Sequence, residues 1–165
     1  PKAPFGVRRL DPAAEGSMTF GYYQAPTARE PTGEYRFNGS RLEDRSLVFA
    51  APIIYHELLP GHHFQVALQL ENESLPTFRR QFGMFGYNAY TEGWAEYAAE
   101  LAGEMGLYDD PYDRLGRLML DAFLSARLVV DSGLNYFGWS LEQARRYMVE
   151  NTYQSETEIA SETLR

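Results

Sequence analysis

The hydrophobic and polar positions divide the chain into a short strand-like part and a longer helical part. Residues 1–45 are rich in glycine, proline and aromatic side chains. Within them, residues 19–24 (TFGYYQ) and 34–38 (EYRFN) are aromatic runs bounded by turn-forming residues, which predicts two short strands. Two strands alone are marginally stable, so we expect this β element to pack against the rest of the protein.

From Arg45 onward the apolar residues recur with helical spacing. The first predicted helix is strongly apolar and contains Pro52, which marks either a kink or a late helix start. The helices predicted from this spacing cover residues 47–59, 62–73, 88–105 and 111–134.

Two capping-box patterns predict where the last two helices begin. Ser140 is followed by Gln143, and Ser155 by Glu158, each at the spacing that lets the two side chains satisfy backbone N–H groups reciprocally. The predicted fold class is therefore mainly α with a small N-terminal β element. Since no linker divides the sequence, we expect a single domain over residues 1–165.

Composition and charge exclude several kinds of function. The net charge of −8 argues against nucleic acid as a partner, because phosphate binding needs a basic face. The chain has no cysteine, which excludes disulfides and thiolate metal ligands. Its apolar runs all fall short of the roughly 18 residues that a membrane span requires.

All three histidines of the chain fall within the segment YHELLPGHHFQ. Zinc peptidases commonly carry H-E-x-x-H, in which one helix face presents both histidines and the glutamate is the general base. Here the next histidines follow His56 at +6 (His62) and +7 (His63). On a straight helix, position +6 points roughly 120° away and +7 lies about 10.5 Å along the axis. Neither position could share a zinc ion with His56.

The intervening residues Pro60 and Gly61 offer a way to restore the spacing. Proline inside a helix clashes with the carbonyl four residues back, and glycine tolerates unusual backbone conformations. If both bulge from the helical path, His62 takes the +4 position. The alternative is that Pro-Gly merely joins two helices. His63 has three open roles, namely replacing His62 as ligand, contacting substrate, or packing.

A third metal ligand has to be a carboxylate, because no other histidine remains. Residues 90–104 carry four glutamates spaced by four, which share one helix face. Glu92 and Glu96 lie among aromatic residues, which suggests partial burial, and a buried carboxylate needs a cation or hydrogen bonds. We expect Glu92 to be the third ligand and Glu96 to orient His56 or His62. The reverse assignment of the two glutamates stays open.

Two histidines and one glutamate would leave a fourth zinc position for water, the usual arrangement of a catalytic site. Zinc lowers the pKa of such a water to about 7. Glu57, adjacent to His56, can take its proton and pass it to the leaving amine. These ligand types indicate Zn²⁺ as the cofactor.

Other polar residues are weaker candidates. Arg127 either pairs with Asp131 one helical turn on, or binds a substrate carboxylate through its guanidinium fork. Tyr22 and Tyr23 either pack within the strand, or one of them faces the cleft. We expect the predicted strands to border the cleft and to receive an extended peptide by strand addition.

Taken together, the motifs resemble a bacterial family called domain of unknown function 885. That family has an HExxPGHHxQ motif followed by EGWAEY. The resemblance covers nearly all of this chain but only the C-terminal part of the longer family proteins. We therefore expect residues 1–165 to be a fragment of the C-terminal catalytic part of a longer protein, and the resemblance leaves open whether this fragment is active alone. It departs at Asn135, where relatives often carry histidine. The matching segments are GYYQAP (21–26), HELLPGHHFQ (56–65), TEGWAEYAAEL (91–101) and ARLVVDSGLN-x-x-GWS-x-x-QA (126–144).

The resemblance implies a fold akin to the gluzincin metallopeptidases, in which two histidines and a glutamate bind zinc. On this sequence these would be His56, His62 and Glu92, with Glu57 as general base. The interrupted spacing is also similar to that of dipeptidyl peptidase III. Many family members are described as lipoproteins or exported proteins, which implies a periplasmic or lipoprotein location for the full-length form. The residues themselves leave the compartment and the oligomeric state open.

Zinc-dependent hydrolysis of peptide bonds, with Glu57 as general base, is the function we expect. A noncatalytic metal-binding or interaction domain is the first alternative, and a zinc hydrolase of a non-peptide amide is the second. Glu57 favours a catalytic site, because a structural zinc site needs no base and usually has four protein ligands.

Overall fold

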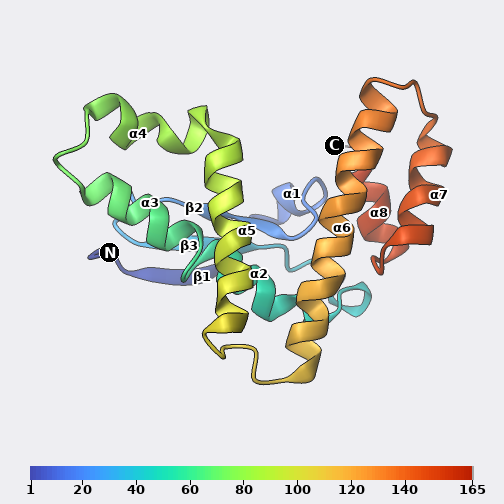
Figure 1. Ribbon diagram of the computed structural model, residues 1–165, viewed down its shortest axis with the longest axis horizontal. Helices are drawn as coiled ribbons and strands as arrows, with labels where there is room; N and C mark the ends of the chain where they lie inside the picture. The colour runs from blue at the N-terminus through green and yellow to red at the C-terminus, as the bar shows by residue number, and fades with distance from the viewer. Residues whose placement is uncertain (165) are drawn as a thin grey trace.

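The computed structural model describes residues 1–164, apart from the side chains of residues 82–85. It is mainly helical with a small sheet in the N-terminal part, which confirms the predicted fold class at this level (Figure 1). The sheet has the order β1-β3-β2, with β1 parallel and β2 antiparallel to β3. Its strands are β1 (Phe5–Arg9), β2 (Gly21–Gln24) and β3 (Gly33–Phe37).

Strands β2 and β3 lie where the sequence predicts them, whereas β1 is an addition. β1 has the sequence FGVRR and is largely exposed, so it lacks the alternation of apolar and polar residues that marks a half-buried strand. β2 lies at the other edge of the sheet and pairs only with β3. One side of β2 is therefore open to additional hydrogen bonding.

The four helices predicted from apolar spacing are present, and the structure adds α1 and α4. Pro52 lies in the first turn of α2, in agreement with a late helix start, and residues 47–49 form a 3-10 turn before it. The helices are α1 (Pro12–Glu15), α2 (Ala50–Glu57), α3 (His62–Glu71), α4 (Thr77–Gly86), α5 (Asn88–Glu104), α6 (Pro111–Asn135), α7 (Leu141–Asn151) and α8 (Glu156–Glu162).

Helix α2 lies at the centre of the packing, against both α5 and α6 (Figure 1). α5 buries four alanines, whose small side chains let the neighbouring helices approach closely. Gly116 serves the same purpose on α6, since a Cβ there would lie 1.7 Å from the carbonyl oxygen of Val48. Larger apolar side chains fill the core, among them Phe49, Ile53, Leu120, Phe123, Val130 and Met148.

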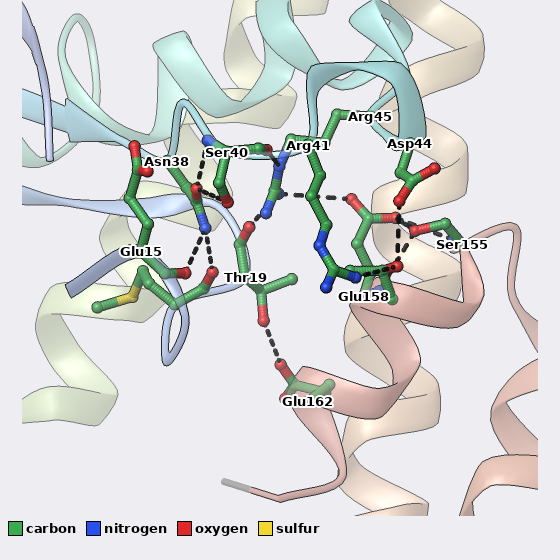
Figure 2. A network of polar contacts seen from close by, with 12 residues as sticks. Glu15, Thr19, Asn38, Ser40, Arg41, Asp44, Arg45, Ser155, Glu158 and Glu162 are labelled. Atoms are coloured by element: carbon green, nitrogen blue, oxygen red, sulfur yellow. Dashed lines mark hydrogen bonds and ion pairs between the residues drawn. The ribbon is translucent and has the colours of Figure 1, made fainter. Parts of the chain in front are cut away.

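Both predicted capping boxes are formed, at Ser140–Gln143 and Ser155–Glu158. The second box begins α8, which a polar network joins to the loop between α1 and β2 (Figure 2). In that network Thr19 donates to the buried carboxylate of Glu162 at 3.3 Å, and Arg45 contacts both the Thr19 carbonyl and Glu158. The network fixes α8 beside residues 17–20, which line the cleft described below.

Across residues 1–164, none of the helices combines the length and apolar character needed to cross a lipid bilayer.

Candidate metal and catalytic site

The helical path is interrupted between α2 and α3, at the place where the sequence predicts a bulge (Figure 1). α2 ends at Glu57 and α3 begins at His62. Leu58 already leaves helical geometry (φ −109°, ψ −97°), and the Leu59–Pro60 peptide bond is cis. The interruption thus spans four residues rather than the predicted two, and it changes the direction of the chain immediately before His62.

Gly61 packs directly on the last turn of α2. A Cβ on this residue would lie 1.8 Å from the carbonyl oxygen of His56, so a larger residue fits only if the backbone moves. From α5, the indole N–H of Trp94 points to the carbonyl oxygens of Pro60 and Gly61, at 3.1 and 3.3 Å. These contacts hold the start of α3 against the end of α2.

The interruption brings His56 and His62 together. Their ring centroids are 4.7 Å apart and the rings are nearly perpendicular, at 88°. Together with Glu57 they offer three ligand atoms that lie within 4.8 Å of one another. Two nitrogens that share one zinc ion lie within roughly 3–4 Å, given Zn–N distances of about 2.0–2.1 Å. Three side chains of the types that can hold a metal ion therefore converge at the interruption.

Glu92 on α5 faces both histidines from the solvent side. Its Oε2 lies 3.4 Å from Nε2 of His56 and 3.6 Å from Nε2 of His62. Two carboxylates therefore border the histidine pair, an exposed one from Glu92 and a buried one from Glu57. The Nε2 atoms of His56 and His62 thus face the same oxygen of Glu92.

Glu57 is a buried carboxyl group beside the two histidines. It is only 8% exposed, and its Oε2 has no hydrogen-bond partner. Burial raises the pKa of Glu57, while the charges of His56 and His62 and the backbone N–H of Tyr23 partly offset that effect. A carboxyl group buried in this way needs a proton, a cation or a ligand beside it.

His56 contacts a glutamate on each side of its ring. Nδ1 lies 2.7 Å from Oε1 of Glu96, a short contact outside the geometry of a regular hydrogen bond. Burial lowers the pKa of His56, but Glu92, Glu96 and the charge of Glu57 outweigh it and raise the pKa to about 9. The histidine contacts lower the pKa of Glu92. The carboxyl groups of Glu57, Glu92 and Glu96 thus favour the protonated form of His56.

The structure places His63 behind the site rather than in the cleft. His63 is completely buried, and burial lowers its pKa. Its Nε2 lies 3.1 Å from the carbonyl oxygen of Ala3, which can only accept, so Nε2 carries the proton. Nδ1 must then accept the hydroxyl hydrogen of Tyr23, at 3.0 Å. Both nitrogens are occupied, and of the roles considered for His63 the structure shows packing.

Tyr23 is buried as well, and its ring stacks on His62 at 6.1 Å between centroids. Its neighbour Tyr22 is exposed, and both line the same cleft. Tyr23 thus supports a histidine ring, while Tyr22 is the strand tyrosine accessible from solvent.

A cleft of about 780 Å³ contains the site. It is lined by His56, His62, Glu57, Glu92 and Glu96. Its walls come from residues 17–20 and β2 on one side, from α5 on another, and from α6 and α8. Two polar residues at its border that the sequence did not single out are Asn88, one turn before Glu92 on α5, and Thr91, directly before Glu92.

Arg127 also lines the cleft, but its predicted partner was wrong. Arg127 pairs with Glu162 of α8, through Nε at 2.5 Å and Nη2 at 2.9 Å, and its guanidinium lies over the ring of Phe123. Asp131 instead accepts from the amide of Asn135 at 3.1 Å. The fold brings Glu162 of α8 against Arg127, although Asp131 lies only one turn from Arg127 on the same helix.

The fold and the site together define a class: a mainly helical domain with a small N-terminal sheet and a histidine–glutamate cluster at a helix interruption. The chain belongs to the family described as "Bacterial protein of unknown function (DUF885)", which it matches over residues 1–165. The family that the sequence motifs indicate is thereby confirmed. No match was found among curated proteins.

One solved structure similar to this chain is the crystal structure of the putative lipoprotein from Colwellia psychrerythraea. The two are 37% identical and superpose with a TM-score of 0.89. The match covers 99% of this chain but 28% of that protein, so the chain spans little more than a quarter of its relative's length.

Proposed function

We propose that this chain is the catalytic part of a zinc-dependent peptidase. The observation that carries the proposal is the environment of Glu57, a buried carboxyl group with a partnerless oxygen beside two histidines that both face Glu92. A packing role would leave that oxygen without compensation for its lost hydration. A role in proton transfer beside a bound metal ion would explain why the Oε2 of Glu57 is buried without a partner.

The residues fit a zinc ion. Two imidazole nitrogens and a carboxylate are the ligand set of open catalytic zinc sites, and a chain without cysteine offers no thiolate alternative. His56, His62 and Glu92 would hold the ion. When bound, zinc supplies Lewis acidity, which polarises a carbonyl group and lowers the pKa of water to about 7.

Glu57 would take the proton from the attacking water and deliver it to the nitrogen of the leaving amine. Its raised pKa suits both halves of this transfer, because the carboxyl group can hold the proton between the two steps. Glu57 is buried, which raises its pKa, whereas Glu92 is ion-paired, which lowers its pKa. This difference distinguishes the proposed base, Glu57, from the proposed ligand, Glu92.

Strand β2 would hold the peptide. The backbone N–H of Tyr23 points to Glu57, hence toward the cleft and away from β3. Because N–H and C=O of one strand residue point the same way and residues alternate, the carbonyls of Tyr23 and Gly21 also face the cleft. An extended peptide can add to this open edge with its backbone beside Glu57.

Two other proposals compete with this one. The same metal site could belong to a noncatalytic interaction domain, or could hydrolyse a non-peptide amide. The similarity to a protein described as a lipoprotein is compatible with export, and we propose a location outside the cytoplasm for the longer protein.

The test is zinc content by mass spectrometry together with turnover of a peptide panel and an amide panel, with and without a chelator. The peptidase proposal expects about one zinc per chain and peptide cleavage that stops on chelation and returns with Zn²⁺. Zinc without any turnover would favour the noncatalytic domain, and turnover confined to the amide panel would favour the second alternative.

A further inference from the structure

Arg117 on α6 is a buried cation directly behind the candidate metal site. Its side chain is 8% exposed and is surrounded by acidic groups. Nη1 lies 2.8 Å from Glu96, Nη2 lies 2.6 Å from Asp121, and Nε makes a longer contact of 3.4 Å with Glu100. A buried arginine is tolerated when its donors are satisfied in this way.

The contact with Glu96 links Arg117 to the site. Oε2 of Glu96 accepts from Arg117, and Oε1 of the same carboxylate lies 2.7 Å from Nδ1 of His56. One oxygen of the Glu96 carboxylate thus accepts a hydrogen bond from a cation, and the other makes a short contact with the imidazole of His56. With Nδ1 turned to Glu96, the ring of His56 directs Nε2 toward Glu92 and the position of the metal.

The backbone fixes Arg117 in this place. The preceding residue, Gly116, touches the backbone of Val48 just before α2, and no side chain would fit between them. Asp121, one helical turn further on α6, holds the other end of the guanidinium. Asp121 and the close approach of Gly116 to the 3-10 turn before α2 therefore fix Arg117 independently of Glu96, so it can act as a fixed point for the carboxylate.

We infer that Arg117 is a positioning residue, which holds Glu96 against His56 and so sets the direction of the metal-binding nitrogen. This inference rests on the proposed function in that it takes His56 to be a metal ligand. Carboxylates that orient a metal-bound histidine typically change metal affinity about 10–100-fold when they are lost. Arg117 would act one contact further from the metal, by holding the carboxylate that orients His56. It comes from α6, which provides none of the proposed ligands.

The test compares Arg117→Met and Arg117→Lys with a matched control, Glu100→Gln. Glu100 makes only the long contact with Arg117 and is exposed, so its substitution should leave zinc affinity unchanged. Arg117→Met should weaken Zn²⁺ binding about 10-fold or more, measured by competition with a chelator. Arg117→Lys keeps the charge without the fork and should recover part of the loss. The cobalt-substituted variants should show a changed visible absorption spectrum.

Crystal structures of the metal-free wild type and of Arg117→Met test the position of Glu96 without zinc. In the variant, Glu96 should turn away from Nδ1 of His56. Unchanged zinc affinity in folded variants, or an unmoved Glu96, would overturn the inference. A wild type that binds no zinc would instead overturn the proposed function, and the crystal structures would still decide whether Arg117 positions Glu96. If Arg117→Met fails to fold, Arg117→Lys decides the case, and wild-type affinity in that variant counts against the inference.

Discussion

The carbonyl oxygen of His56 lies so close to Gly61 that a Cβ on the glycine would approach it to 1.8 Å. This contact joins the end of the helix that carries one histidine to the start of the helix that carries the other. It is the physical reason why a +6 spacing brings the two imidazole rings together.

Gly61→Ala should therefore separate His56 from His62. The added methyl group cannot be accommodated unless one helix end moves, so we expect a loss of about 1–3 kcal/mol in unfolding free energy and weaker zinc binding. Chemical denaturation and chelator competition measure the two effects. Gly93→Ala is the matched control, since a Cβ there meets nothing within 4 Å. Equal zinc affinity in Gly61→Ala and wild type would contradict this explanation of the spacing.

Trp94→Phe should loosen the same junction from the opposite side. The variant keeps a large aromatic ring but removes the N–H that reaches the carbonyls of Pro60 and Gly61. Loss of hydrogen bonding there should cost about 0.5–1.5 kcal/mol in unfolding free energy. Amide hydrogen exchange should become faster at residues 62–65. If exchange in this segment stayed as slow as in the wild type, the indole would not be what fixes the start of α3.

The zinc-free protein should lose stability as the pH rises through about 9. The folded-state pKa of His56, about 9, lies above its ordinary value of 6.5. The corresponding stabilisation is thus fully present below pH 6.5 and disappears as His56 deprotonates in the folded protein. From the size of the shift it is on the order of 3 kcal/mol.

Urea denaturation between pH 6 and 10, with chelator present, measures this effect. The variant His56→Gln lacks the titrating group and should show a flatter profile over the same range. Zinc should act in the opposite sense, since it competes with the proton on His56, so the stabilisation by zinc should grow with pH. A wild-type profile that matched His56→Gln would argue that His56 is uncharged at neutral pH.

A bound peptide should protect the free edge of β2. Hydrogen–deuterium exchange with a non-cleavable peptide analogue should slow at Gly21, whose cleft-facing N–H would pair with the ligand, whereas the N–H of Tyr23 already points to Glu57. β1, at the far edge of the sheet, is the internal control and should exchange as before. Protection limited to helices would show that the peptide lies elsewhere.

Much of the fold could be predicted because its elements carry local signals. The capping boxes and the apolar spacing fix most helices, and Pro60–Gly61 predicts the interruption between α2 and α3. β1 could not be predicted, since its exposed FGVRR segment becomes a strand only through pairing with β3. Strand formation of this kind depends on partners rather than on propensity.

Glu92 and Glu96 were predicted although they are distant from His56 in sequence, but the ion pairs of the two arginines at the site were missed. Arg117 lies 21 residues from Glu96 in the sequence. The local hint was that Arg117 shares the buried face of α6 with Leu120, where a charged residue needs a partner. The partner of Arg127 is 35 residues away on α8. Local spacing cannot identify such pairs, because the turn between helices decides which residues meet.

The central claim is that Glu57 is the base and Glu92 a ligand, and one paired measurement tests it. Zinc content and peptide turnover are determined for Glu57→Gln and Glu92→Gln beside the wild type. We predict that Glu57→Gln retains zinc and loses about 10²–10⁴-fold in turnover, because glutamine cannot accept a proton. Glu92→Gln should lose both zinc and turnover, because a ligand charge is removed. Near-normal turnover in Glu57→Gln, or full zinc content in Glu92→Gln, would contradict the account.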